Sequence, residues 1–248
     1  MIRILTLDIK QSLLLIVFLL ALPLSTLSAE TSTNNDLVMT EIIFEEVEPG
    51  LEPFKSRLLL SKKMLRLDDD DDQGDYILYD REAHEIHSFN HEDKSHLMMK
   101  PLPVEVLDFE IDFKVESKPL TDAPKVNAVV PVQHQFFADK KLCKKSLNVK
   151  GLLPDLTQVL IDYEQVIVEQ SKQTLWQIPA DVRSSCYMSN NYLYASDYLK
   201  VGFPLFVTDD LGRQKKLLSF RQIKKDRSIM QQPVGYNLYY PNASNLPK

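Results

Sequence analysis

Glycine is scarce in this chain, with 6 residues among 248, or about 2% where ~7% is usual. No G-x-G-x-x-G fingerprint or Walker-type loop occurs, so the known backbone cradles for nucleotide phosphates are absent. The G-x-S-x-G nucleophile elbow and the local cysteine-protease signatures are missing too. We therefore expect no enzymatic activity and no cofactor. A Ser-His-Asp triad or a pair of catalytic carboxylates drawn from distant positions would leave no such signature, and that alternative stays open.

Basic residues are outnumbered: Lys and Arg total 29 against 35 Asp and Glu, which gives a formal net charge of -6. A nucleic-acid binder normally carries a basic patch, so the balance argues against a nucleic-acid partner. With 44% hydrophobic and 26% charged residues, the composition is that of an ordinary globular protein.

Long apolar runs are absent apart from residues 13–22, which follow Arg3 and Lys10 and end at Pro23. This run is shorter than the ~20 residues that a membrane span needs, and the layout is typical of a signal peptide. We expect a signal peptide at 1–29, a flexible tether at 30–36, one domain at 37–240 and a loose tail at 241–248. The protein would be periplasmic or secreted, by a bacterial or a eukaryotic route. Membrane contact would come only through this segment, if it stayed uncleaved as an anchor.

Cysteine is limited to Cys143 and Cys186, and no C-x-x-C redox motif occurs. In an oxidising compartment an even number of cysteines favours a disulfide, so we expect these two to be bonded. Two buried free thiols or a metal-binding pair are the alternatives.

Short segments of strand character, separated by polar turns, fill the first half of the domain and predict an antiparallel meander. The predicted strands are 38–44, 54–60, 63–67, 76–79, 85–89, 95–99 and 106–115, then a hairpin of 134–143 with 145–149, a second hairpin of 205–207 with 216–220, and an edge strand within 233–240. The acidic run 68–72 is interpreted as a solvated turn, because adjacent carboxylates repel each other.

One long amphipathic helix is predicted over 154–176, because its apolar residues recur at intervals of three and four. Asp155 with Gln158 resembles a capping box at its start. A second, shorter helix is expected within 181–200. The fold class is therefore α+β: a curved antiparallel sheet or incomplete β-barrel wrapped over the two helices. The candidate ligand cavity is lined by Leu156, Leu160, Tyr163, Ile167 and Trp176, although the same side chains would equally suit a filled core.

Four of the five histidines, His84, His87, His91 and His96, crowd one stretch. Imidazole is a good ligand for zinc or copper, so a metal site is one hypothesis. The spacing departs from H-E-x-x-H, and on a strand positions 84 and 87 point to opposite faces. Exposed histidines in strands and turns are the simpler interpretation.

The segment 65–99, with its runs 76–81 and 86–95, resembles a family of bacterial secreted proteins of unknown function. The C-terminal pattern of Gly202 and Pro204 followed by Pro233, Gly235 and Tyr236 is similar to the ending of the same family. That family is similar to the periplasmic lipoprotein-carrier fold, an incomplete antiparallel barrel with helices on its open side. The resemblance implies a concave apolar interior that holds an acyl chain or a lipoprotein, and it brings no catalytic residues.

Our leading hypothesis is therefore a non-enzymatic periplasmic protein that binds a hydrophobic ligand between sheet and helix, with a lipid or an envelope protein as its partner. A structural or protein-interaction module without a small ligand is the first alternative. A metal-binding protein that uses the four histidines is the second.

Overall fold

The structure, a computed structural model, describes residues 35–103, 107 and 109–241, all within one unit that begins at Asn35. The predicted signal peptide at 1–29, most of the tether at 30–36 and the tail from 242 lie outside the described residues. None of the helices in these ranges has the length and apolarity that crossing a membrane requires.

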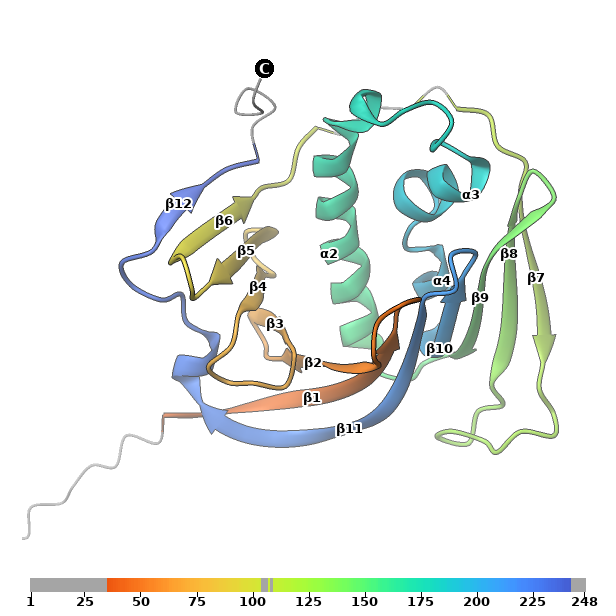
Figure 1. Cartoon of the computed structure of the whole chain (residues 1–248). Helices are drawn as coiled ribbons and strands as arrows, with labels where there is room; N and C mark the ends of the chain where they lie inside the picture. Colours follow the sequence, from red (N-terminus) through yellow and green to blue (C-terminus); the bar gives the residue numbers. More distant parts are fainter. Residues whose placement is uncertain (1–34, 104–106, 108, 242–248) are drawn as a thin grey trace, which may run out of the picture. The chain divides into compact units, whose positions relative to one another are not determined.

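Twelve strands form one large sheet in the order β12-β6-β5-β4-β3-β2-β1-β11-β10-β9-β8-β7 (Figure 1). All neighbours pair antiparallel except β12 and β6, which are parallel. Within the described residues the edge strands β12 and β7 have no pairing with each other, so the sheet is open. The predicted class, α+β with a curved, mainly antiparallel sheet, agrees with this architecture.

The first half of the chain forms the predicted meander. Its strands are β1 (Asp36–Val47), β2 (Phe54–Leu60), β3 (Met64–Asp68), β4 (Tyr76–Asp80), β5 (Glu85–Asn90) and β6 (Ser95–Met99). The polar turns between them agree with the predicted boundaries to within a few residues.

The second half of the chain adds six strands, five on the other side of β1 and one, β12, beside β6. They are β7 (Phe113–Pro119), β8 (Val132–Ala138), β9 (Lys141–Val149), β10 (Phe203–Asp209), β11 (Gln214–Asp226) and β12 (Asn237–Tyr239). β11 pairs with β1 along its whole length, from Asp36 opposite Asp226 to Val47 opposite Gln214. This pairing joins the first and the last long strands of the described chain.

The meander is covered on both faces. Helix α2 (Pro154–Lys172) lies across one face, where Leu58 and Leu60 share a core cluster with Leu156 (Figure 1). Leu59 points to the other face and packs with Met230 from the segment that follows β11. Burial on both faces explains why β2 ends in three consecutive leucines where a half-exposed strand would alternate.

Helix α2 starts without the predicted capping box. Leu153 occupies the N-cap position with a positive φ of 45°, and no side chain of the described residues caps the helix. Pro154 follows in the first turn, where its missing N–H has no intrahelical partner to lose. Asp155 binds Arg81 instead, with 2.6 Å between Oδ1 and Nη2. The helix ends at Lys172, and a short 3-10 turn, η1 (Leu175–Gln177), follows.

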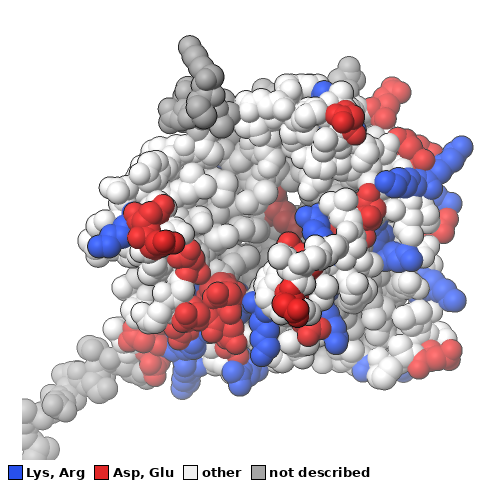
Figure 2. Space-filling model, in the orientation of Figure 1, with Lys and Arg blue, Asp and Glu red and all other residues white. Residues whose placement is uncertain are grey.

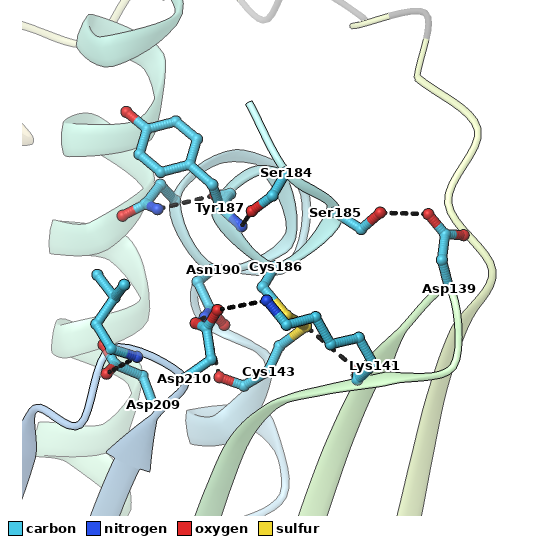
Figure 3. Close-up of a disulfide and its surroundings, with 12 residues drawn as sticks. Asp139, Lys141, Cys143, Ser184, Ser185, Cys186, Tyr187, Asn190, Asp209 and Asp210 are labelled. Carbon is cyan, nitrogen blue, oxygen red and sulfur yellow. Dashed lines mark hydrogen bonds and ion pairs between the residues drawn. A yellow bond between two sulfur atoms is a disulfide. The ribbon is translucent and has the colours of Figure 1, made fainter. Parts of the chain in front are cut away.

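The region 181–200 is not one continuous helix. It is divided into α3 (Ser185–Met188), a π-helical turn η2 (Ser189–Leu193) and α4 (Asp197–Lys200). The predicted disulfide is confirmed, because Cys143 in β9 is bonded to Cys186 in α3 (Figure 3). The bond attaches these helical turns to the sheet.

The alternation at 106–115 does not produce a strand over its full length. β7 begins only at Phe113, whereas Phe109 and Ile111 pack against a cluster that includes Leu175 and Met188. The alternating apolar residues of this segment therefore pack against helical turns and do not form a strand. The hairpin of β8 and β9 also turns earlier than expected, at Asp139 and Lys140, which both have positive φ. A two-residue hairpin turn needs that conformation, and the residue pair lacks the usual Asn-Gly or Asp-Gly signal.

The acidic run is not a uniformly solvated turn, which corrects the expectation for its first member. Asp68 is buried and bound by Arg57 at 2.8 Å and by Arg66 at 2.5 Å. Both arginines are buried as well. Asp70 and Asp72 extend from the turn and bind Arg57. We call Arg57, Arg66 and Asp68 the arginine–aspartate cluster.

Candidate functional site

A cleft of about 470 Å³ lies along α2 between the helical turns η2 and α4 and the neighbouring ends of β1, β10 and β11. Figure 2 shows this face hollowed beside α2, with acidic and basic side chains at the wall of the hollow. We call this space the α2 cleft. Its lining residues are Glu46, Val47, Glu48, Lys144, Tyr163, Glu164, Ile167, Val168, Ser171, Asn190, Asn191, Ala195, Tyr198, Val207, Asp209, Arg213, Gln214 and Lys215.

Helix α2 supplies one wall of the cleft with a single face. Tyr163, Glu164, Ile167, Val168 and Ser171 recur at intervals of three and four residues, which places them along one stripe. At 1.5 Å per residue, the stretch from Glu164 to Ser171 is about 10 Å long. A carboxylate therefore lies one turn from two aliphatic side chains on the same surface.

Glu164 is the least satisfied group in the cleft. Its Oε1 accepts a hydrogen bond of 2.6 Å from the hydroxyl of Tyr198. Its Oε2 is buried and has no hydrogen-bond partner in the described structure. Burial raises the pKa of the Glu164 carboxyl, and the Tyr198 hydroxyl and Lys144 only partly oppose this effect. One acceptor site on this carboxylate is therefore unfilled within the described residues.

Lys144 projects into the same cleft from β9. Its Nζ donates to the carbonyl of Ala195 at 3.3 Å and lies 4.5 Å from the centre of the Tyr198 ring. Within the described ranges it forms no ion pair with a carboxylate. Burial lowers the pKa of the Lys144 ammonium, although Glu164 and Asp209 act in the opposite direction. An ammonium has three donors, so this one has capacity for further partners.

Tyr198 holds these two groups in place. Its hydroxyl binds Glu164 and its ring lies beneath Lys144. Burial, and then the neighbouring Glu164, raises the pKa of the Tyr198 hydroxyl well above its usual value, so it stays a hydrogen-bond donor. We call Lys144, Glu164 and Tyr198 the polar cluster of the α2 cleft.

Four of the charged residues at the rim are paired among themselves. Lys215 binds Glu46 at 2.8 Å, and Arg213 binds Asp209 at 2.6 Å. Burial alone would raise the pKa of Glu46, but Lys215 and Ser56 lower it below its usual value, so the carboxylate stays ionised. Among the described residues of the lining, the polar cluster and the exposed Glu48 are the charged groups outside these pairs.

The five residues predicted to line one ligand cavity lie in three different surroundings. Tyr163 and Ile167 line the α2 cleft. Leu156 is buried in the core between sheet and helix, and Leu160 packs against that core. Trp176 is 67% exposed and stacks on Phe109, away from the cleft lining. The sheet–helix interior is therefore largely filled, and the open space lies beside α2.

Of the four clustered histidines, His87 and His96 lie together, and His84 and His91 have other partners. His87 and His96 are both buried, and their ring nitrogens Nδ1 and Nε2 are 2.9 Å apart. His84 binds the hydroxyl of Tyr79, and His91 lies 3.4 Å from Asp75. In the ranges that the structure describes, no three His, Cys, Asp or Glu side chains gather where they could hold a metal ion. Two of the four predicted histidine ligands are therefore close together, but the described residues provide no third ligand beside them.

Sequence reasoning missed the polar cluster because its members come from β9, α2 and α4. One signal was present in the helix itself. Glu164 lies four residues after Leu160 and four before Val168, so a carboxylate interrupts an otherwise apolar stripe. A charge at such a position is either paired in the core or directed into a site.

Comparison with known proteins adds little to this geometry. No family model matches the chain, and no curated protein matches it. Among solved structures, it is similar to PNGF-II in a C2 crystal form, with 11% identity and a TM-score of 0.39 over 84% of this chain and 31% of that chain. A P21 form of PNGF-II gives 10% identity and a TM-score of 0.36 over 82% of this chain and 31% of that chain. The chain spans less than a third of these structures, and the similarity is too low to assign an activity.

Proposed function

We propose that this protein is a non-enzymatic binding protein of the cell envelope that holds an amphipathic ligand in the α2 cleft. The ligand would be an acyl-bearing molecule, either a lipid or the lipidated end of a lipoprotein. The observation that carries the proposal is the wall formed by α2, where Ile167 and Val168 lie one turn from the unpaired Oε2 of Glu164. Apolar burial would supply most of the affinity, and the polar groups would fix the orientation.

The resemblance to the lipoprotein-carrier fold supports the same proposal. A curved open sheet with a helix across its face is the arrangement that the resemblance implies. The disulfide Cys143–Cys186 supports an oxidising compartment such as the periplasm or the secretory route, in agreement with the predicted signal peptide. The filled sheet–helix core shifts the proposed ligand position from the barrel interior to the cleft beside α2.

Binding of a fluorescent fatty acid to the purified protein tests this proposal. Ser171→Trp places a bulky ring in the cleft, and we expect it to weaken binding at least tenfold. Gln158→Trp makes the same change on the exposed side of α2 and is the matched control, expected to bind as the parent does. Native mass spectrometry of protein purified without detergent should show a lipid-sized adduct. Equal binding by both variants, or no saturable binding by the parent, would overturn the proposal.

A protein-interaction module is the second candidate, and one feature of the sheet favours it. β7 pairs with β8 on one side and forms a sheet edge on the other, where an extended partner segment could add a strand. Lys114, Glu116 and Lys118 place charges along this edge, which disfavours indiscriminate pairing. If the protein carries no amphiphile but cross-links to an envelope protein, and Val115→Lys abolishes the cross-link, this function replaces the first.

A further inference from the structure

We propose that the polar cluster of the α2 cleft is a head-group site for a zwitterion, a ligand that carries a primary ammonium and an anionic oxygen group close together. This inference deepens the proposed function, because it names the chemistry of the polar end of the ligand. A phosphoethanolamine head is the simplest envelope lipid group with this chemistry.

Glu164 provides the position for the ammonium. Its Oε1 accepts a hydrogen bond from Tyr198, whereas Oε2 is buried and has no partner among the residues that the structure describes. A buried acceptor without a donor is rare in folded proteins and calls for a specific explanation. A primary ammonium has three N–H donors and a charge opposite to that of the carboxylate, so it would satisfy Oε2 and favour the ionised form. A quaternary ammonium has no N–H and could not do so.

Lys144 provides the position for the anionic group. One of its donors goes to the carbonyl of Ala195, and no carboxylate in the described residues pairs with it. Asp209, the nearest acidic candidate on β10, is held by Arg213 at 2.6 Å. A phosphate or carboxylate oxygen of a ligand would therefore meet a cation that forms no direct ion pair within the described residues, although Glu164 and Asp209 act on it electrostatically.

A ligand satisfies both positions only if it carries an ammonium and an anionic group. An anionic ligand would satisfy Lys144 and leave Oε2 of Glu164 unpaired, and a simple amine would do the reverse. A zwitterion satisfies both and brings no net charge into the cleft. Tyr198 contacts both groups, so one side chain fixes the spacing between the ammonium and the anion positions. The apolar wall at Ile167 and Val168 begins one helical turn away, where the chain attached to such a head would lie.

Calorimetry with short-chain lipids below their micelle concentrations tests the inference. The probes are phosphatidylethanolamine, phosphatidylglycerol and phosphatidylcholine with identical chains, a free fatty acid, and phosphoethanolamine alone. We expect phosphatidylethanolamine to bind at least tenfold more tightly than the glycerol and choline lipids. Glu164→Gln should reduce that preference to less than threefold. Lys144→Met should weaken both phosphatidylethanolamine and phosphatidylglycerol.

Two matched variants control for the loss of a charge elsewhere. Lys141→Met removes an exposed lysine from the same strand as Lys144, and Glu116→Gln removes an exposed carboxylate from β7. Both should bind every probe as the parent does, and circular dichroism should show that all variants are folded.

The possible outcomes separate this inference from the function on which it rests. Equal affinity for the three lipids, with the fatty acid still bound, would overturn the head-group site and leave the carrier function standing. No binding of any amphiphile, with tight binding of phosphoethanolamine, would support the head-group site and overturn the lipid ligand. No binding of any probe would overturn both.

Discussion

Two clusters of buried charged residues differ in how many of their polar atoms have partners. In the arginine–aspartate cluster, Asp68 receives hydrogen bonds from Arg57 at 2.8 Å and from Arg66 at 2.5 Å, and a backbone carbonyl accepts another from Arg66. In the polar cluster of the α2 cleft, the described residues provide no hydrogen-bond partner for Oε2 of Glu164 and no carboxylate in an ion pair with Lys144. In the first cluster, the buried side-chain nitrogen and oxygen atoms all have hydrogen-bond partners within the protein, as in a structural network. The second leaves bonds open beside a cavity, as a binding site does.

Substitution of Asp68 is the strongest test of this comparison. Burial alone would lower the pKa of the Arg57 guanidinium, but Asp68 and Asp72 raise it above its usual value. Asp68→Ala would leave two buried guanidinium groups without their shared carboxylate, and we expect it to lower the free energy of unfolding by about 3–5 kcal/mol. Urea denaturation measures the loss. Asp69→Asn, at an exposed position in the same turn, should change it by less than about 0.5 kcal/mol; an equal loss from both variants would contradict the structural role.

Removal of the disulfide should have the next largest effect, and it acts on the wall of the α2 cleft. The bond joins residues 43 apart and attaches α3 and η2 to β9 (Figure 3). Chain entropy predicts a loss of about 4 kcal/mol when such a loop is opened. Cys143→Ala with Cys186→Ala should therefore lower the urea midpoint and weaken fatty-acid binding as well. Asp68→Ala, studied under conditions where it is still folded, should leave that binding unchanged. If both variants lose binding equally, the two regions are not independent.

Acid should lower the free energy of unfolding through two histidines of the meander, the part of the sheet that also contains the arginine–aspartate cluster. Burial lowers the pKa values of His87 and His96, which lie on β5 and β6. Because the folded state then holds fewer protons than the unfolded state, stability is full at neutral pH and is lost as the pH falls below about 6.5. Each group adds a slope of up to about 1.4 kcal/mol per pH unit.

Thermal unfolding between pH 8 and pH 5 measures this dependence. His87→Phe keeps a ring in the pair but removes one titrating group, so its pH dependence should be flatter than that of the parent. His91→Gln changes a histidine outside the pair and is the matched control. An unchanged slope in His87→Phe would assign the acid sensitivity to other groups, of which the buried His134 is the first to examine.

The same contrast explains which parts were predictable from the sequence. The strands of the meander follow from local signals, because polar turns such as 80–84 and 90–94 separate short apolar runs. The disulfide follows from the count of two cysteines. Neither charge cluster could be predicted in this way, because Arg57, Arg66 and Asp68 meet only when β2 and β3 pair. Lys144, Glu164 and Tyr198 meet only when three elements distant in the chain pack together. Trp176 was misplaced because the periodic pattern continued past the true end of α2 at Lys172.

Substitution of Glu164 should have the smallest effect on the free energy of unfolding. It therefore gives the clearest contrast with the substitution of Asp68. Burial raises the pKa of this carboxyl, so its charge opposes folding of the empty protein. Glu164→Gln keeps an acceptor for the Tyr198 hydroxyl and removes the charge. We expect the free energy of unfolding to stay constant or to rise by up to about 1 kcal/mol at pH 7, in contrast to the large loss from Asp68→Ala. Urea denaturation of the two variants side by side measures the difference. A loss above about 2 kcal/mol from Glu164→Gln would show that Glu164 serves the fold as Asp68 does, and its free oxygen would then no longer indicate a ligand.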